Sequence, residues 1–421
     1  MILWCNVSKG KCKNKKVMAI NVFYGFLKRR HFWRYATFSE VAELYASRIF
    51  RVAAMYIAGG FTSVYLYKIG YGLSFVILCW ACLYLFKAFM TFFSAFLIAN
   101  VGPKHGTLVS NLLCIPAMLA IGLVPNIGFI GVVIWGIFIG ISGAIYQLCY
   151  HVDFSKIKNI EHAGKEIAFM NIFEKITMGV SPVIGGLIAL WFSPQVVMLL
   201  AALLFVVAAL PLFGTSEPVR TKQKLSFIDF PWRTVFSSIM AQSGVGFDAA
   251  VTSVVWVLFV AVAILPNSGD SIYVYLGILS SVSIIIAILA SYAYGKLIDR
   301  NHGRYLLRFS VIGNSLVHIS RAFTLTIQSV IGVNITNEIA TTGQSMAFMR
   351  GMFDTADLSG HRIVYLCLSD IVSNIGASLA CFIASYSVMC LGDINGFRVV
   401  FIMAAIAVLM VNMAHFNLYR K

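Results

Sequence analysis

The chain has 421 residues, of which 60% are hydrophobic and only 11% are charged, and its mean hydropathy is +0.86. This composition excludes a soluble globular protein of the same length and predicts an all-α membrane protein with many spans. The net charge of +16 does not indicate nucleic-acid binding, because most Lys and Arg residues lie in a leader and in alternate connections between apolar segments.

Residues 1–36 form the basic leader. Its apolar run, Val17–Leu27, is too short to span a bilayer, has charge on both sides and lacks a small-residue cleavage site. We therefore expect an interfacial helix whose basic flanks favour anionic lipid headgroups, and no signal peptide. Met18 is an alternative start of the natural protein.

The first membrane helix is predicted to begin at Thr37 and Glu40, which have the spacing of a capping box, and to end near Lys68. Allowing about twenty apolar residues per crossing, we predict twelve spans in total. The others fall near residues 72–98, 106–124, 127–150, 167–192, 195–214, 235–265, 271–298, 304–325, 327–350, 361–390 and 395–418.

The polar connection 215–234 separates the first six spans from the last six. We therefore expect one six-helix bundle over residues 37–214 and a second over residues 235–421. The connections at 124–128, 192–195 and 265–271 contain no Lys or Arg. This asymmetry predicts that both termini face the cytosol across the plasma membrane.

The two halves repeat at an offset of 196 residues. The segment 165–186 aligns with 361–382, which places Glu174 on Asp370. These two acids could meet across a pseudo-two-fold axis or line a cytosolic gate. Alternatively, the adjacent Lys175 neutralises Glu174 locally.

Ionisable side chains deep in apolar spans are costly and are therefore candidates for substrate binding or proton coupling. Six lie that deep: Lys87, Glu174, Lys175, Asp248, Glu338 and Asp370. Glu338 is the strongest candidate, because it shares one polar helix face with Asn334 and Thr342, which lipid would reject. The alternative is a hydrogen-bonded seam between helices.

Asp248 lies similarly deep in its span and could support Glu338, or could pair with a neighbouring cation. Lys87 could be such a cation, or could contact the substrate. Asn314, His318 and Arg321 form another polar stripe, at i, i+4 and i+7, which we interpret as packing, with Arg321 extending its charge towards the membrane surface.

The segment after the eighth span carries the pattern Gly295-x-x-x-Asp299-Arg300-x-x-Gly303-Arg304. It resembles the loop signature of the major facilitator superfamily, with one residue added at Asn301–His302. Gly295 would allow close helix packing, Gly303 a tight turn, and the arginines would keep the loop in the cytosol. In that family the loop acid latches one conformation, so we expect Asp299 to lie near Arg350.

Two further stretches resemble this family. Ser181-Pro182-x-x-Gly185-Gly186 is similar to the fifth-helix signature of many proton-driven exporters, a helix-packing motif. Tyr150-His151-x-Asp153-Phe154, followed by Gly164-Lys165-Glu166, is similar to the connection between the fourth and fifth helices of bacterial members. The resemblance implies two six-helix bundles that rock about a central cavity lined by the seventh and tenth helices.

The sequence carries no phosphate loop, His-Glu-x-x-His or other enzyme signature, and its nine cysteines lack metal-ligand spacing. We expect no enzymatic activity, cofactor or metal, and a monomer that uses a proton gradient, because buried carboxylates can titrate. Efflux of a drug-like or cationic metabolite is the leading hypothesis. The alternatives are an importer of sugar, peptide or amino acid, and a non-transporting receptor or membrane-embedded enzyme.

Overall fold

The computed structural model describes residues 38–157, 163–214, 225, 227–282, 284–300 and 302–419. The predicted interfacial helix and the capping residue Thr37 lie outside these residues, as does most of the connection 215–234. Every long element in the described part of the chain is a helix, so the predicted all-α membrane fold is confirmed.

The N-terminal group of helices is built from the apolar segments before the connection. It comprises α2 (Phe38–Lys68), α3 (Leu73–Val101), α4 (Pro103–Gly122), α5 (Val124–Ile127), α6 (Phe129–Ile157), α7 (Ala163–Trp191) and α8 (Pro194–Ala209).

The C-terminal group follows the connection. It comprises α9 (Trp232–Ala250), α10 (Trp256–Phe259), α11 (Ile272–Val282), α12 (Ile284–Asp299), α13 (Gly303–Ala322), α14 (Ile327–Leu358), α15 (Arg362–Leu391) and α16 (Asp393–Leu409). Two π-helical segments, Val251–Val255 and Val260–Ile264, flank α10 and make α9 to Ile264 one continuous rod.

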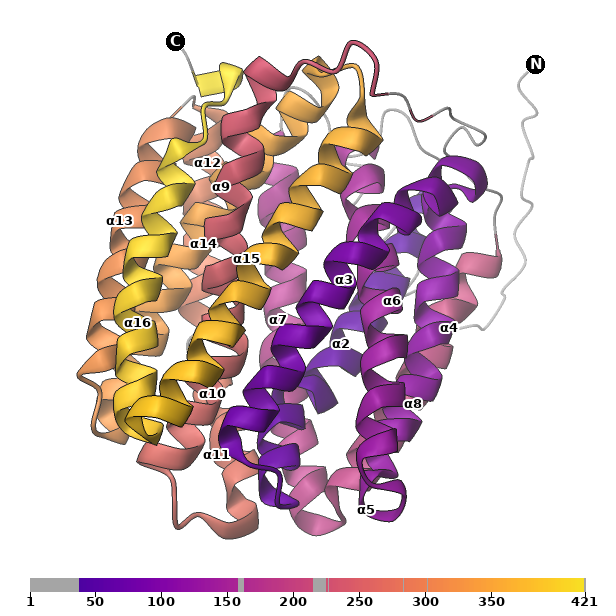
Figure 1. Ribbon diagram of the computed structural model, residues 1–421. Helices are drawn as coiled ribbons and strands as arrows, with labels where there is room; N and C mark the ends of the chain where they lie inside the picture. Colours follow the sequence, from indigo (N-terminus) through magenta and orange to yellow (C-terminus); the bar gives the residue numbers. More distant parts are fainter. Residues whose placement is uncertain are drawn as a thin grey trace, which may run out of the picture.

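The two groups lie side by side, the N-terminal one in indigo and magenta and the C-terminal one in orange and yellow (Figure 1). Two interfaces, which we call seams, join the groups along the helices. In one, α3 packs along α15, and in the other, α7 packs along α11 and α12. We call the end of the bundle that carries Tyr419 the upper end, as in Figure 1, and the end that carries α5 the lower end.

Glycines allow the backbones to approach on the α7 seam. A Cβ added to Gly186 would lie 2.6 Å from the carbonyl oxygen of Tyr273 on α11, and one added to Gly277 would lie 2.7 Å from that of Pro182. Gly185 similarly faces the backbone of Ile57 on α2. Pro182, Gly185 and Gly186 therefore lie where α7 packs closely on two other helices.

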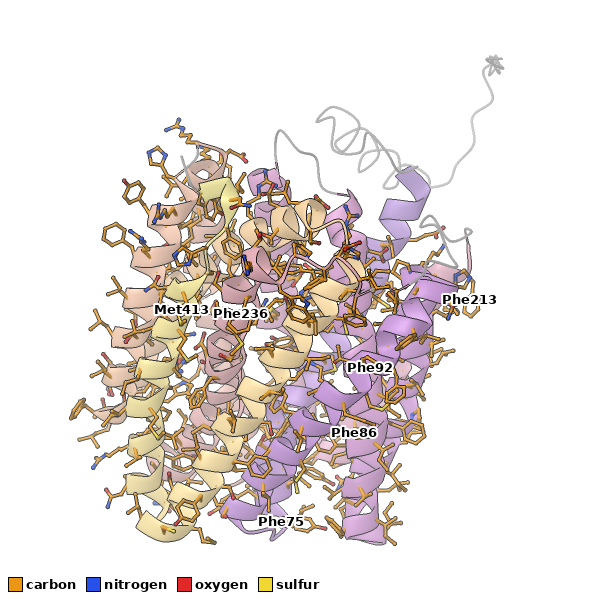
Figure 2. All side chains as sticks on the ribbon, turned by 45° about the horizontal axis from the view of Figure 1, so that its top comes forward. Phe75, Phe86, Phe92, Phe213, Phe236 and Met413 are labelled. Carbon is orange, nitrogen blue, oxygen red and sulfur yellow. The ribbon has the colours of Figure 1, made fainter. Side chains whose placement is uncertain are left out.

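Ten helices in the described part of the chain are long and apolar enough to cross a membrane. Their outer surface is apolar: Phe75, Phe92, Phe236 and Met413 lie on it and are between 37% and 57% exposed (Figure 2). The helices α13 and α14 fall short of that criterion, because both carry many polar residues. The expected count of twelve spans therefore stays a prediction.

The buried apolar residues form two clusters that are separated by depth along the helices. On α14 the lower cluster reaches Val333, and the upper cluster begins at Met346. On α13 the lower cluster reaches Val317, and the upper cluster begins at Val311. Glu338 lies in the interval on α14, and Lys87 lies in the corresponding interval on α3. We call this middle zone the polar layer.

Candidate functional site

An ion pair within the polar layer joins the two groups of helices. Lys175 on α7 donates to the carboxylate of Glu338 on α14. Their side chains remain 16% and 24% exposed, so this pair is accessible although it lies deep in the helices. This partial exposure distinguishes the Lys175–Glu338 pair from the fully buried polar side chains described below.

The residue before Lys175 has a different partner. Glu174 accepts from Nε of Arg48 on α2 at 2.5 Å, and Arg48 also donates to the hydroxyl of Tyr146 at 2.8 Å. The guanidinium carbon lies 3.4 Å from the ring centroid of Tyr150. The hypothesis that Lys175 neutralises Glu174 is therefore wrong, because each of these neighbours pairs with a different helix.

Arg51, one turn along α2, is only 3% exposed and is held by neutral groups. It donates to Asn111 at 2.7 Å and to Ser142 at 3.1 Å, and it lies 3.7 Å from the ring centroid of Tyr146. Sequence reasoning did not select Arg48 or Arg51, because it placed them near the start of the first span. Their spacing of three residues on one helix face was the available signal.

A second contact between the groups involves Asp370 on α15, whose Oδ1 lies 3.1 Å from Nδ1 of His151 on α6. Lys87 interacts electrostatically with Asp370, and its aliphatic chain packs beside Gly143, where an added Cβ would lie 3.2 Å from Cε. Asp370 and Glu174 occupy equivalent repeat positions but bind different partners. Lys87 thus lies close enough to Asp370 for their opposite charges to interact.

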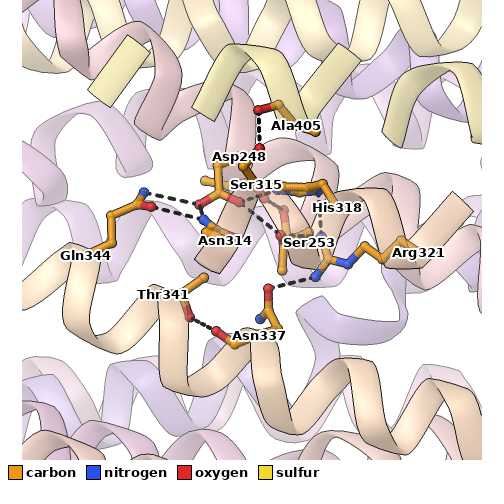
Figure 3. Close-up of polar contacts among 12 residues, drawn as sticks. Asp248, Ser253, Asn314, Ser315, His318, Arg321, Asn337, Thr341, Gln344 and Ala405 are labelled. Atoms are coloured by element: carbon orange, nitrogen blue, oxygen red, sulfur yellow. Dashed lines mark hydrogen bonds and ion pairs between the residues drawn. The ribbon is translucent and has the colours of Figure 1, made fainter. Parts of the chain in front are cut away.

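Asp248 belongs to a buried network inside the C-terminal group (Figure 3). Its Oδ1 lies 2.8 Å from Nε2 of His318, and its Oδ2 accepts from Asn314 at 2.9 Å. Arg321 lies 3.2 Å from Nδ1 of His318 and donates to Thr252 and Asn337, both at 2.9 Å. The expected extension of Arg321 to the membrane surface is wrong, since its side chain is 0% exposed.

The contacts fix the protons of this network. A guanidinium can only donate, so Nδ1 of His318 accepts from Arg321, and Nε2 carries the proton that is donated to Asp248. His318 is then neutral between one anion and one cation, and the network carries no net charge. Such mutual compensation is what allows three ionisable side chains to remain buried.

The other predicted site residues have packing contacts. Asn334 accepts from the indole nitrogen of Trp256 at 2.9 Å, and Thr342 is buried, with 1% of its surface exposed. Asp248 is bonded within its own group and does not pair with Glu338. Arg321 links them, because it interacts electrostatically with both carboxylates.

The loop signature lies at the upper end. Gly295 is buried near the end of α12, whereas Arg300 and Arg304 are exposed. Gly303 begins α13 and lies against the ring of Tyr419, with which an added Cβ would collide. This glycine therefore serves close packing, where a tight turn was expected.

The phenol of Tyr419 donates to the carbonyl of Ala347 at 2.9 Å, and burial raises its pKa. Arg350 interacts electrostatically with the same phenol. The contact of Asp299 with Arg350 stays a prediction.

The family model described as Major Facilitator Superfamily matches residues 44–380. No curated protein sequence matches the chain. Among solved structures, the human organic anion transporter MFSD10 (TETRAN) is similar, with 9% identity and a TM-score of 0.65, over 89% of this chain and 100% of that one.

Two peptide-transporter structures are also similar. A POT family transporter in complex with a thioalcohol-conjugated peptide has 11% identity and a TM-score of 0.70, over 88% of this chain and 95% of that one. A mutant of the peptide transporter POT in complex with sulfate has 9% identity and a TM-score of 0.66, over 90% and 96%. At these identities the similarity shows the fold.

Proposed function

The chain belongs to the major facilitator superfamily and is therefore an integral membrane transporter rather than an enzyme, and we propose that it moves a small solute by proton-coupled alternating access. The two groups of helices, residues 37–214 and 235–421, are the units that move. All twelve expected spans cross the membrane in this proposal, α13 and α14 included, because their polar faces are turned to partners inside the bundle.

Contacts between the groups lie on both sides of the polar layer. At the lower end, the hydroxyls of Ser74 on α3 and Ser385 on α15 are 3.0 Å apart. Towards the upper end, Sγ of Cys367 lies 3.6 Å from the carbonyl of Thr91 on the same pair of helices. Alternating access requires these contacts to separate at one end at a time, so that α3 and α15 pivot about the middle of their seam.

The observation that carries proton coupling is the partly exposed ion pair of Lys175 and Glu338 between the groups. Protonation of Glu338 removes the charge that attracts Lys175 and weakens this contact between moving units. Re-ionisation restores the contact. A proton bound on one side and released on the other would therefore bias the equilibrium between the two arrangements.

The same pair suggests how a solute binds. A cationic or drug-like solute competes with Lys175 for Glu338, which agrees with the leading hypothesis of efflux. A zwitterionic peptide or amino acid is the second candidate, because adjacent opposite charges can each bind one terminus, and two solved relatives of similar fold are peptide transporters.

Substituting Glu338→Gln tests the proposal, since glutamine keeps the shape of the side chain and its hydrogen bonding but cannot titrate. Proteoliposomes with an imposed proton gradient should lose accumulation of a lipophilic cation such as ethidium, or of dialanine, while downhill exchange persists. The matched control is Asp393→Asn, which removes an exposed carboxylate at the lower end.

Normal, pH-dependent accumulation by the Glu338→Gln protein would show that another group carries the proton. Failure of the unaltered protein to move either solute would instead leave the alternatives of a sugar importer or a non-transporting receptor.

A further inference from the structure

A groove of about 650 Å³ runs along the outer side of the C-terminal group, between α12, α13 and α14. Neither Lys175 nor Glu338 is among its lining residues. Side chains from Tyr305 to Ser320 of α13 line it along one helix face, and Leu297 and Ile339 line it from the two neighbouring helices. These sixteen residues of α13 extend over about 24 Å, which is most of the ~30 Å thickness of a bilayer core.

The wall of the groove suits a hydrocarbon chain. Phe309 is 72% exposed and Leu316 58% exposed beside it. Two of its hydroxyls are already used, since Ser320 donates to the carbonyl of Leu316 and Thr336 to that of Gly332, both at 3.0 Å. The groove therefore offers a mainly apolar surface along its length.

The upper end of the groove is cationic. His302 lines it, and Arg304 and Arg308 are exposed one residue before the lining residues Tyr305 and Phe309, so they flank its edge. Lys296 is also exposed at this end, with Nζ 4.1 Å from the ring centroid of Tyr292. A hydrocarbon groove that ends in several cations matches one chemistry, that of an acyl chain attached to an anionic headgroup.

We propose that this groove is a binding site for an anionic phospholipid. One acyl chain lies along α13, and the phosphate lies at the upper end among His302, Arg304 and Arg308. We expect a membrane lipid to occupy the site, because the groove opens on the apolar outer surface, where the surrounding solvent is lipid. It is independent of the proposed proton coupling at Glu338.

The test compares lipids retained by the purified protein in native mass spectrometry after exchange into mixtures of phosphatidylglycerol and phosphatidylcholine. The unaltered protein should retain phosphatidylglycerol selectively. The double variant Arg304→Gln/Arg308→Gln should weaken its retention by about tenfold or more, given the attraction of each cation for an anionic surface. The control Arg233→Gln removes an exposed cation on α9, away from the groove, and should change nothing.

A second variant separates the acyl chain from the headgroup. A Cβ on Gly313 would meet only Cβ of Ala340, at 3.6 Å, so Gly313→Leu should fill the groove without disturbing the fold. It should release the lipid while all cations remain, and thermal unfolding should then no longer respond to added phosphatidylglycerol.

Equal retention of both lipids, or no effect of either variant, would overturn the proposal and leave ordinary annular lipid. Stabilisation by glycerol 3-phosphate alone would show a headgroup site without an acyl groove. Displacement of lipid by self-association, seen as a cross-linked dimer through this face, would assign the groove to a second copy of the chain.

Discussion

At the scale of single residues, the neighbours Glu174 and Lys175 show how one helix serves two tasks. Successive side chains on a helix point about 100° apart, so Glu174 reaches Arg48 within its own group while Lys175 reaches Glu338 in the other. A change in the ionisation of Glu338 therefore acts on Lys175, which lies one residue from an acid that Arg48 already neutralises. Motion between the two groups of helices can then leave the pair of Glu174 and Arg48 intact.

The buried network of Asp248, His318 and Arg321 belongs to the same scale and should behave as a unit. Asp248→Asn removes the carboxylate that compensates Arg321 within this network, which should cost about 3–5 kcal/mol of stability. The measurement is the thermal unfolding midpoint in detergent. Adding Arg321→Gln to the same protein should recover much of the loss, because the unpaired charge is then gone.

If the single and double variants unfold at the same temperature, the two charges do not compensate each other. His318 would then need a different protonation state from the one its contacts indicate.

Depth in an apolar span was enough to single out Glu338, Asp248 and Asp370 from the sequence. Their partners could not be predicted, because pairing depends on how helices far apart in sequence pack. Arg321 was misjudged for a related reason. It lies one residue from the end of α13, where an arginine usually extends to the surface, and hydrogen bonds to Thr252 and to Asn337 on α14 hold it inside.

At the scale of helices, the boundaries of most predicted spans agree with the structure. The predicted segment 304–325 is α13 (Gly303–Ala322), whereas the segment 327–350 is extended as α14 to Leu358. The π-helical turn that begins at Val251 was not predictable, since five residues are too short for their polarity to show a period that distinguishes helix types. That turn includes Thr252, whose hydroxyl accepts from Arg321.

The pivot seam leads to a prediction at this scale. Replacing Ser74 and Ser385 with cysteine should place two sulfurs within bonding reach, because the hydroxyl oxygens are 3.0 Å apart. Oxidation should link α3 to α15, stop transport by holding the lower end closed, and be reversed by dithiothreitol. Each single cysteine variant serves as the control, since native cysteines are present. Undiminished transport by the fully linked protein would contradict opening at this end.

At the scale of the whole molecule, the predicted membership of the major facilitator superfamily and the all-α membrane fold are confirmed. Composition and the loop signature sufficed for that. The arrangement of the apolar core was not foreseen: its two clusters are stacked by depth and each includes helices of both groups. A linear sequence does not reveal this, because the division follows the membrane axis.

Orientation is the prediction that concerns the molecule as a whole. With an even number of crossings and basic residues in alternate connections, both termini should face the cytosol. Green fluorescent protein fused after Lys421 should fluoresce in bacterial cells, and alkaline phosphatase at the same place should be inactive. Alkaline phosphatase inserted after Ser268, in a connection without Lys or Arg, should be active. The reverse pattern would invert the topology.

The polarity of α13 and α14 has a consequence for the way the protein is made. Each helix alone would expose amide and charged side chains to hydrocarbon during insertion, whereas together they bond Arg321 to Asn337 and Asn314 to Gln344. Only a short connection, 323–326, separates them. The translocon would therefore have to release this pair into the bilayer as one hairpin, after α9 has already provided Asp248 for it to dock against.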